Sequence, residues 1–282
     1  MLHQSLLDLA AQAPLSETPA TARGVLAESH ELLRNALDHD EPEPQLSAWY
    51  STLVVDTLRS PAAVELTGGV GLLPSGAVAR GDALPSSTVT WLSTGDEAAS
   101  AALAELVAAA GLPVSHTSLA SCRARSGEAE ALATLIDAGV SAPGVPPRVL
   151  LADAVASRPP TLRIQDGLPD RSMPVDVRAV LLLPVSDVAR WAFPRAGSTL
   201  ARIDAAVARD RLSPGEAEAL RQAWETGVAL QFRRWADRVH DRPVSLAELP
   251  VLHRTAYGAA ARMVAGVLRS LAARHGLLLE GN

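Results

Sequence analysis

The sequence predicts an α/β domain followed by an all-α domain, with a helical segment before them. Two observations support this fold class. Short β-prone runs alternate with helical patterns between residues 62 and 157, which is typical of a small mixed sheet covered by helices. Beyond residue 175 the apolar residues follow only the helical period. We therefore expect a helical segment at residues 1–60, an α/β domain at 61–157 and an antiparallel four-helix bundle at 175–279.

The first 60 residues have the apolar spacing of amphipathic helices. The two longest patterns are "TARGVLAESHELLRNALDHD" and "LSAWYSTLVVDTLRS". The stretch Asp40–Gln45 separates them, because it is acidic and contains prolines. Pro61 is expected to end the second of these helices.

The α/β domain is predicted from four short runs that favour strands. They are "AVEL", "STVTWL", "PVSH" and "PRVLLADAVA", which begin at residues 63, 87, 113 and 147. The last run is almost entirely apolar, so we expect a buried strand that enters a loop. Helices are expected between these runs, one of them capped by Asp96 and another ending at Gly139.

A stretch rich in proline and polar residues, Ser157–Asp176, predicts the linker to the helical domain. Pro184 predicts a bend in the first helix that follows. A later helix has a complete start signal, with Ser213 as the cap, Pro214 at the first position and Glu216 at the third.

Composition excludes several classes of function. All 25 basic residues are arginine, so mechanisms that require a lysine, such as a Schiff base, are excluded. The net charge of −6 argues against general binding of nucleic acid. The single cysteine, Cys122, excludes an intramolecular disulfide and a cysteine-rich zinc site. No run reads as a signal peptide or membrane span, so we expect a cytoplasmic protein without a membrane partner.

The stretch "LLPSGAVARGDALPSSTVTWLS", Leu72–Ser93, has the pattern of a strand, a turn of small residues and a second strand. Together with "VDVRAVLLLPVSDVARWAF" and "LQFRRW" in the later helices, it resembles bacterial nucleotidyltransferases that carry a C-terminal helical substrate-binding domain. These are relatives of protein-PII uridylyltransferases and glutamine-synthetase adenylyltransferases. The resemblance covers residues 47–275 and implies a nucleotidyltransferase-like mixed sheet with helices, followed by a helical domain that binds the acceptor.

The family motif has a Gly-Ser turn, an Arg-x-Glu pair and then Asp-x-Asp on the next strand. Gly76 and Ala77 fall on the Gly-Ser turn, and Arg80 and Asp82 match the Arg-x-Glu pair. The resemblance therefore implies that Gly76, Ala77 and Arg80 bind the nucleotide. Another interpretation is that Arg80 and Asp82 form only a surface ion pair of little energetic value.

Thr88 and Thr90 fall on the Asp-x-Asp positions, where the family places its metal ligands. Neutral hydroxyls are poor substitutes, because carboxylate oxygens bind Mg²⁺ much better. By resemblance the remaining catalytic carboxylates are Asp82 and Asp153, the latter matching a carboxylate on a later strand. No confident metal site results, and Mg²⁺ is expected only if the chain is active.

Several polar residues of the helical domain are candidates for binding the acceptor by the same resemblance. They are Arg178, Asp187, Arg190 and Arg233. The alternative for each is a solvated helix face with local ion pairs, as expected for Asp187 and Arg190 at i, i+3. For Arg234 we expect this solvated face.

Three functions remain open. The first is a nucleotidyltransferase-family protein of the uridylyltransferase-like type, which would pass a nucleotidyl group from an NTP to a protein or small acceptor but has lost catalysis. The second is a non-catalytic regulatory or scaffold protein that uses the helical bundle as an interaction surface. The third is a residual transferase that recruits Asp82 and Asp153 to one metal, unless Trp91 and apolar neighbours fill the cleft.

Overall fold

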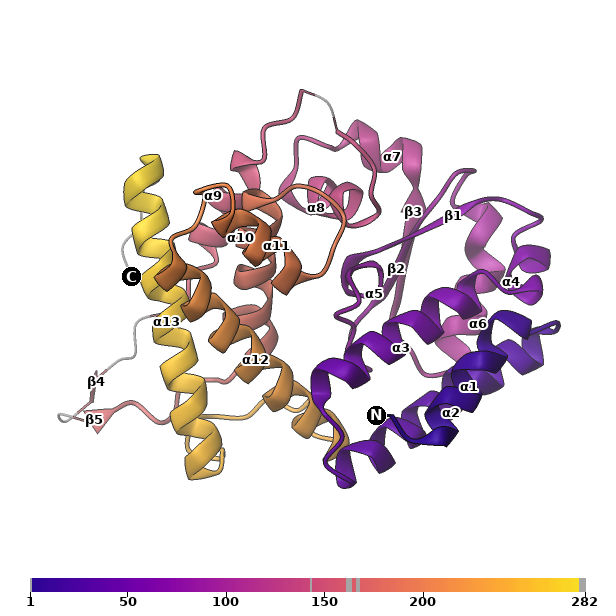
Figure 1. Ribbon diagram of the computed structural model, residues 1–282, viewed down its shortest axis with the longest axis horizontal. Coiled ribbons are helices and arrows are strands. Elements are labelled where there is room, and N and C mark those ends of the chain that lie inside the picture. Colours follow the sequence, from indigo (N-terminus) through magenta and orange to yellow (C-terminus); the bar gives the residue numbers. More distant parts are fainter. Residues whose placement is uncertain (1, 143, 161–163, 166–167, 279–282) are drawn as a thin grey trace. The chain divides into compact units, whose positions relative to one another are not determined.

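The computed structural model describes residues 2–142, 144–160, 164–165 and 168–278 (Figure 1). The chain forms two compact units. One runs to Val145 and includes the short segment Arg195–Ser198. The other comprises Pro146–Pro194 and the chain from Thr199 onward. Each unit has its own core and is considered by itself.

The first unit begins with helices. They are α1 (Gln4–Gln12), η1 (Ala13–Leu15), α2 (Pro19–Asp38), α3 (Glu43–Leu58) and α4 (Pro61–Leu66). The predicted strand "AVEL" is wrong, because this run is the end of α4. The Ser60 hydroxyl accepts a hydrogen bond from the amide of Ala63, and Pro61 occupies the first turn. Pro61 therefore begins a helix, since proline suits a position whose N–H has no helical partner.

A three-stranded mixed sheet follows the helices. Its strands are β1 (Leu72–Ser75), β2 (Val89–Ser93) and β3 (Val114–Ser118). β2 is central, pairing antiparallel with β1 and parallel with β3. The connecting helices are α5 (Gly76–Arg80), η2 (Ala98–Ser100), α6 (Ala101–Ala109), α7 (Leu119–Ala124) and α8 (Ala129–Asp137). The predicted small mixed sheet with helices is thus confirmed.

The two faces of β2 are buried by different residues. Leu92 packs with Cys122, Ala131 and Leu135 of α7 and α8. Because successive side chains on a strand point to opposite faces, Trp91 lies on the other side of the sheet. Its ring stacks on that of His116 in β3, with centroids 5.4 Å apart and planes 11° apart.

The second unit is helical. Its elements are α9 (Arg148–Ala156), β4 (Ile164–Gln165), β5 (Leu168–Pro169), η3 (Arg178–Leu182), α10 (Leu183–Ala192), α11 (Thr199–Val207), α12 (Pro214–Ala236) and α13 (Val251–His275). Part of the predicted linker, residues 161–163 and 166–167, lies outside the described residues. The described part of that stretch includes the short pair β4–β5.

The predicted strand "PRVLLADAVA" is wrong, because it forms α9 and packs against α10 and α13. Its buried residues, Leu150, Leu151, Ala154 and Val155, repeat with a helical period. Among the described residues the unit therefore has one helix more than the predicted four-helix bundle. The break between the compact units follows Val145 and not the expected linker.

The predicted bend at Pro184 stays a prediction. Pro184 lies in the first turn of α10, directly after the π-helical turn η3, where the missing N–H of proline costs little. The predicted helix start at Ser213 is present. Ser213 and Glu216 form a capping box at the start of α12. Within the described residues, no helix is long and apolar enough to cross a membrane.

Candidate functional site

The strand–turn–strand expected at Leu72–Ser93 is built around Gly76. Gly76 has φ +63°, a left-handed conformation that favours glycine, and it starts α5 directly after β1. Ser75 pairs with Thr90 across the antiparallel strands. A side chain at Gly76 would lie 3.6 Å from the side chain of Thr90. The turn therefore approaches one of the two threonines at the Asp-x-Asp positions.

Arg80 lies at the end of α5 between two carboxylates, which we call the ion cluster (Arg80, Asp82 and Asp137). Its Nε donates to Asp82 Oδ2 at 3.0 Å, and its Nη1 donates to Asp137 Oδ2 at 2.5 Å. The exposed fractions of these side chains are 6%, 8% and 1%, respectively. The guanidinium thus supplies the opposite charge that both buried carboxylates require.

The interpretation of Arg80 and Asp82 as a surface ion pair is wrong, because both side chains are buried. Sequence reasoning also missed Asp137, which ends α8. One signal could have identified it: a carboxylate beside the apolar residues Leu135 and Ile136, two residues before Gly139, the glycine that follows the helix. A charged residue on such a face normally has a buried partner.

The two threonines are partly buried where β2 begins. Thr90 lies in β2 and Thr88 immediately precedes it. Residues two apart on a strand share a face, as the Asp-x-Asp pattern requires. The Thr90 hydroxyl donates to the backbone oxygen of Thr88 at 3.4 Å. Neither side chain can supply a negative charge.

The serine hydroxyl of the family turn is also lost, since Ala77 occupies its position. Ser75, the residue before Gly76, does not replace it. Its hydroxyl donates to the backbone oxygen of Thr134 in α8 at 2.6 Å, and the residue is fully buried. Ser75 therefore connects the sheet to a helix.

These side chains do not fit Mg²⁺. The ion prefers carboxylate oxygens in octahedral geometry, whereas two neutral hydroxyls and the arginine-paired Asp82 are present here. Asp153, expected on a strand, lies exposed on α9 in the second unit. Within the described residues, no group of three or more His, Cys, Asp or Glu side chains is arranged to hold a metal ion.

Trp91 does not occupy the threonine side of β2. It is fully buried on the opposite face, and its indole Nε1 has no hydrogen-bond partner. Apolar filling by this tryptophan is therefore not what removes the metal site. The poor fit comes from the identity of Thr88 and Thr90 and from the pairing of Asp82.

Two candidate acceptor-binding residues interact directly in the second unit. Arg190 Nη1 donates to Asp187 Oδ1 at 2.5 Å, which confirms that they share one face of α10. Both side chains are largely buried. The same nitrogen lies 3.2 Å from the Ser186 hydroxyl. A buried ion pair of this kind positions α10 side chains and is not a solvated face.

The other two candidates are exposed. Arg178 lies at the start of η3, and Arg233 on α12 has its Nε 3.3 Å from Asp237 Oδ2. The solvated face expected for Arg234 is wrong. Arg234 is buried and donates to the backbone oxygens of Val239 and Arg242 at 2.8 and 2.9 Å. Burial lowers the pKa of Arg234, although nearby carboxylates oppose this shift.

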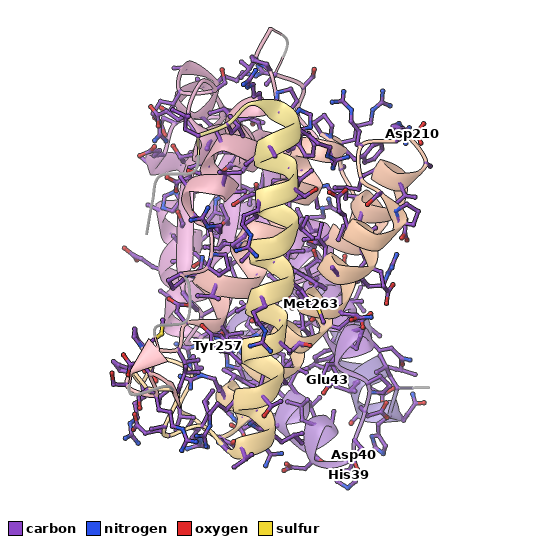
Figure 2. All side chains as sticks on the ribbon, turned by 90° about the vertical axis from the view of Figure 1, so that its left-hand side faces the viewer. His39, Asp40, Glu43, Asp210, Tyr257 and Met263 are labelled. Atoms are coloured by element: carbon purple, nitrogen blue, oxygen red, sulfur yellow. The ribbon has the colours of Figure 1, made fainter. Side chains whose placement is uncertain are left out.

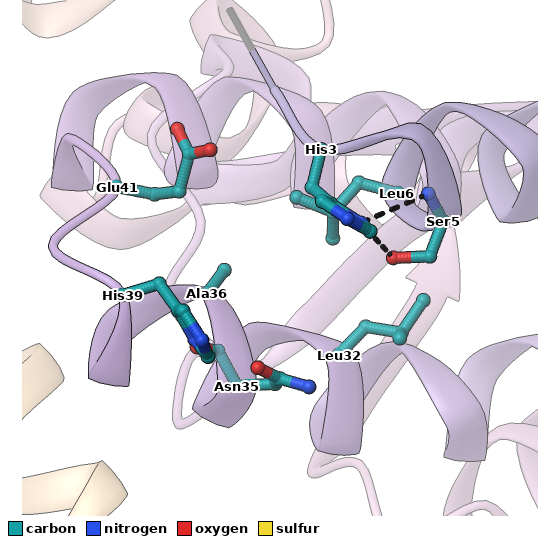
Figure 3. Close-up of a pocket in the computed structure, with 8 residues that line it drawn as sticks. All are labelled: His3, Ser5, Leu6, Leu32, Asn35, Ala36, His39 and Glu41. Atoms are coloured by element: carbon teal, nitrogen blue, oxygen red, sulfur yellow. Dashed lines mark hydrogen bonds between the residues drawn. The ribbon is translucent and has the colours of Figure 1, made fainter.

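A surface cavity of about 270 Å³ lies elsewhere in the first unit (Figure 3). Its lining comes from α1, α2 and the turn after α2, and consists of His3, Ser5, Leu6, Leu32, Asn35, Ala36, His39 and Glu41. The His3 ring interacts with Ser5, and His39 Nδ1 lies 2.8 Å from the backbone oxygen of Asn35. None of the residues expected to bind nucleotide or acceptor lines this cavity.

The comparisons with known proteins bear on the second unit. Residues 150–275 match the model of a family described as "putative nucleotidyltransferase substrate binding domain". No curated protein and no solved structure matches the chain. The matched residues run from α9 to the end of α13. The match supports a relation to nucleotidyltransferases, in agreement with the resemblance seen in the sequence.

Proposed function

We propose that this chain is a nucleotidyltransferase-related protein that has lost metal-dependent transfer and acts by binding. The reaction it would otherwise perform is the uridylyltransferase-like transfer of a nucleotidyl group from an NTP to a protein or small acceptor. The helical unit binds that acceptor. The family match at residues 150–275 supports this last role.

The pairing of Asp82 with Arg80 is the observation that carries the proposal. Nucleotidyl transfer requires Mg²⁺ to neutralise the triphosphate and to hold the phosphoryl group in line. Because the buried guanidinium of Arg80 already compensates the charge of Asp82, this carboxylate attracts a metal ion less than an unpaired carboxylate would. With threonine at both remaining positions, the motif has no unpaired carboxylate for Mg²⁺.

The arrangement of Thr88 and Thr90 suggests a direct experiment. Because the two residues lie on one face beside the Gly76 turn, the double variant Thr88→Asp/Thr90→Asp recreates the missing pair of ligands. We expect the variant to bind Mn²⁺ at least about tenfold more tightly than the unchanged chain, since carboxylates are the preferred ligands. Isothermal titration calorimetry measures this directly.

The matched control places the same two charges on exposed helical positions, as Thr52→Asp/Thr255→Asp. This control should leave Mn²⁺ binding unchanged. Equal gains in both double variants would show that added charge, and not the geometry of the motif, attracts the ion. Strong Mn²⁺ binding by the unchanged chain would contradict the loss of the metal site.

A regulatory or scaffold role without any nucleotide is the second candidate. The internal ion pair of Asp187 and Arg190 favours it, because these groups already satisfy each other within the helical unit. Titration with ATP and UTP in the absence of metal distinguishes a protein that still binds nucleotide from a scaffold that does not. Nucleotide binding supports a retained nucleotide site, whereas no binding supports the scaffold.

A further inference from the structure

Four basic side chains of the helical unit lie at the end where α13 finishes. We call it the arginine end and define it by Arg148, Arg211, Arg274 and His275. Arg148 begins α9, Arg211 lies in the turn between α11 and α12, and the other two end α13. Figure 2 shows α13 in front and labels Asp210, which marks the turn that carries Arg211.

Contacts between helices hold this end together. Arg148 Nη2 donates to the backbone oxygen of His275 at 3.0 Å, so α9 caps the last turn of α13. Arg274 Nη2 donates to both oxygens of Glu216 in α12, at 2.9 and 2.7 Å. The Ser270 hydroxyl also donates to Glu216, at 2.8 Å. The basic groups are therefore fixed by packed helix ends.

The positive charge at this end affects the pKa of the His275 imidazole. Its ring packs edge-on against the buried Trp191, with centroids 4.9 Å apart. Burial lowers the pKa of His275, and the positive charges of Arg274, Arg211 and Arg148 lower it further. The charge of Glu216 opposes them. Arg274 is paired with Glu216, whereas Arg148 and Arg211 form no ion pair with any described residue, so two positive charges at this end are not compensated by an ion pair.

Helix ends explain part of this charge but not all of it. Arginines near a helix C-terminus stabilise the last carbonyls, as Arg148 does here. Arg209 does the same for the Ala205 oxygen and also lies over the Phe193 ring. Arg211 has no such role, because its exposed side chain makes no hydrogen bond or ion pair with any described residue. Its charge is available to a ligand.

We propose that the arginine end binds the phosphate group of a phosphorylated acceptor. A phosphate monoester carries roughly −1.5 to −2 charges at pH 7, which matches the excess of two positive charges. The planar guanidinium of arginine can donate two parallel hydrogen bonds to phosphate oxygens. The inference rests on the proposed function, in that it takes the helical unit as the unit that binds the acceptor.

Arg211 and His275 provide the test, with inorganic phosphate as the probe and the full chain in solution. The proton resonances of His275 are followed by NMR while pH is varied, with phosphate or with chloride at equal ionic strength. Bound phosphate should raise the pKa of His275, because a nearby anion favours the imidazolium form. Arg211→Ala should weaken phosphate binding by about tenfold or more, since charge-assisted hydrogen bonds are lost.

Arg269→Ala is the matched control. Arg269 is exposed, as Arg211 is, but it lies on α13 outside the arginine end. It should retain the phosphate response. An unchanged His275 titration in millimolar phosphate would overturn the proposal, as would equal weakening in the two variants. Metal-dependent nucleotide binding would overturn the proposed loss of transfer without touching the phosphate site, so the two failures are distinguishable.

Discussion

Arg80 is the buried cation that compensates two buried carboxylates of the first unit. Its guanidinium donates to Asp82 and Asp137, and all three side chains are buried. Replacing such an arrangement completely by apolar residues can be neutral, but removing one partner leaves uncompensated charge in the interior. The ion cluster therefore ties the end of α5 to the end of α8, next to the turn at Gly76.

Arg80→Ala should lower the free energy of unfolding by about 3–5 kcal/mol, because two carboxylates lose their shared cation. Urea unfolding measures the change. The matched control is Arg125→Ala, which removes an exposed arginine 3.9 Å from Glu128. Its cost should be within about 0.5 kcal/mol.

A further variant tests the cause of that loss. Combining Arg80→Met with Asp82→Asn and Asp137→Asn removes all three charges, so part of the lost stability should return. If Arg80→Ala costs no more than Arg125→Ala, the cluster is not the buried charge network described above.

At the scale of elements, the capping boxes show how local chemistry fixes helix boundaries. Glu216 accepts from the amide of Ser213 at 2.9 Å, and the Ser213 hydroxyl accepts from the amide of Glu216 at 3.2 Å. The same carboxylate receives hydrogen bonds from Ser270 and Arg274 of α13. One glutamate thus starts α12 and joins it to the end of α13.

Stability should depend on pH through Glu216. Burial alone would raise its pKa, but hydrogen bonds from Ser213 and Ser270 and the charge of Arg274 outweigh burial and lower it. A depressed folded-state pKa stabilises the fold above the ordinary glutamate value of about 4.3, and this contribution is lost as pH falls further. Glu216→Gln should therefore be less stable than the unchanged chain at pH 7.

The difference between the two proteins should shrink as pH falls below the ordinary glutamate range. Urea unfolding at several pH values measures it, with Glu218→Gln as the control on the same helix. Glu218 is exposed and pairs with Arg221 on the surface, so its replacement should change stability by less than about 1 kcal/mol. A Glu216→Gln difference that is constant with pH would contradict the assignment.

Elements with explicit end signals could be predicted from the sequence, and elements defined by tertiary packing could not. Ser213, Pro214 and Glu216 identified the start of α12. By contrast, α4 and α9 were expected as strands, because short apolar runs do not reveal their period. The Ser60 cap and the prolines before Arg148 were the signals that favoured helices.

At the scale of the whole chain, sequence reasoning predicted the order of an α/β part and a helical part, and the strand, turn and strand around Gly76. It could mark Asp137 as a buried carboxylate but could not assign Arg80 as its partner, because the two residues are far apart in sequence and only folding brings them together. Nor could it reveal the arginine end, whose members come from three separate segments. Both features depend on long-range packing, which local patterns do not encode.

We propose that this chain no longer uses a metal ion to bind a nucleotide or to transfer its nucleotidyl group. Calorimetry with ATP and UTP, each with and without Mg²⁺, tests it most directly and needs no knowledge of the acceptor. Because Thr88 and Thr90 supply no negative charge to the ion and Asp82 is paired with Arg80, we predict that Mg²⁺ leaves the dissociation constant of either nucleotide unchanged. Binding that becomes about tenfold tighter with Mg²⁺, followed by release of pyrophosphate, would contradict it.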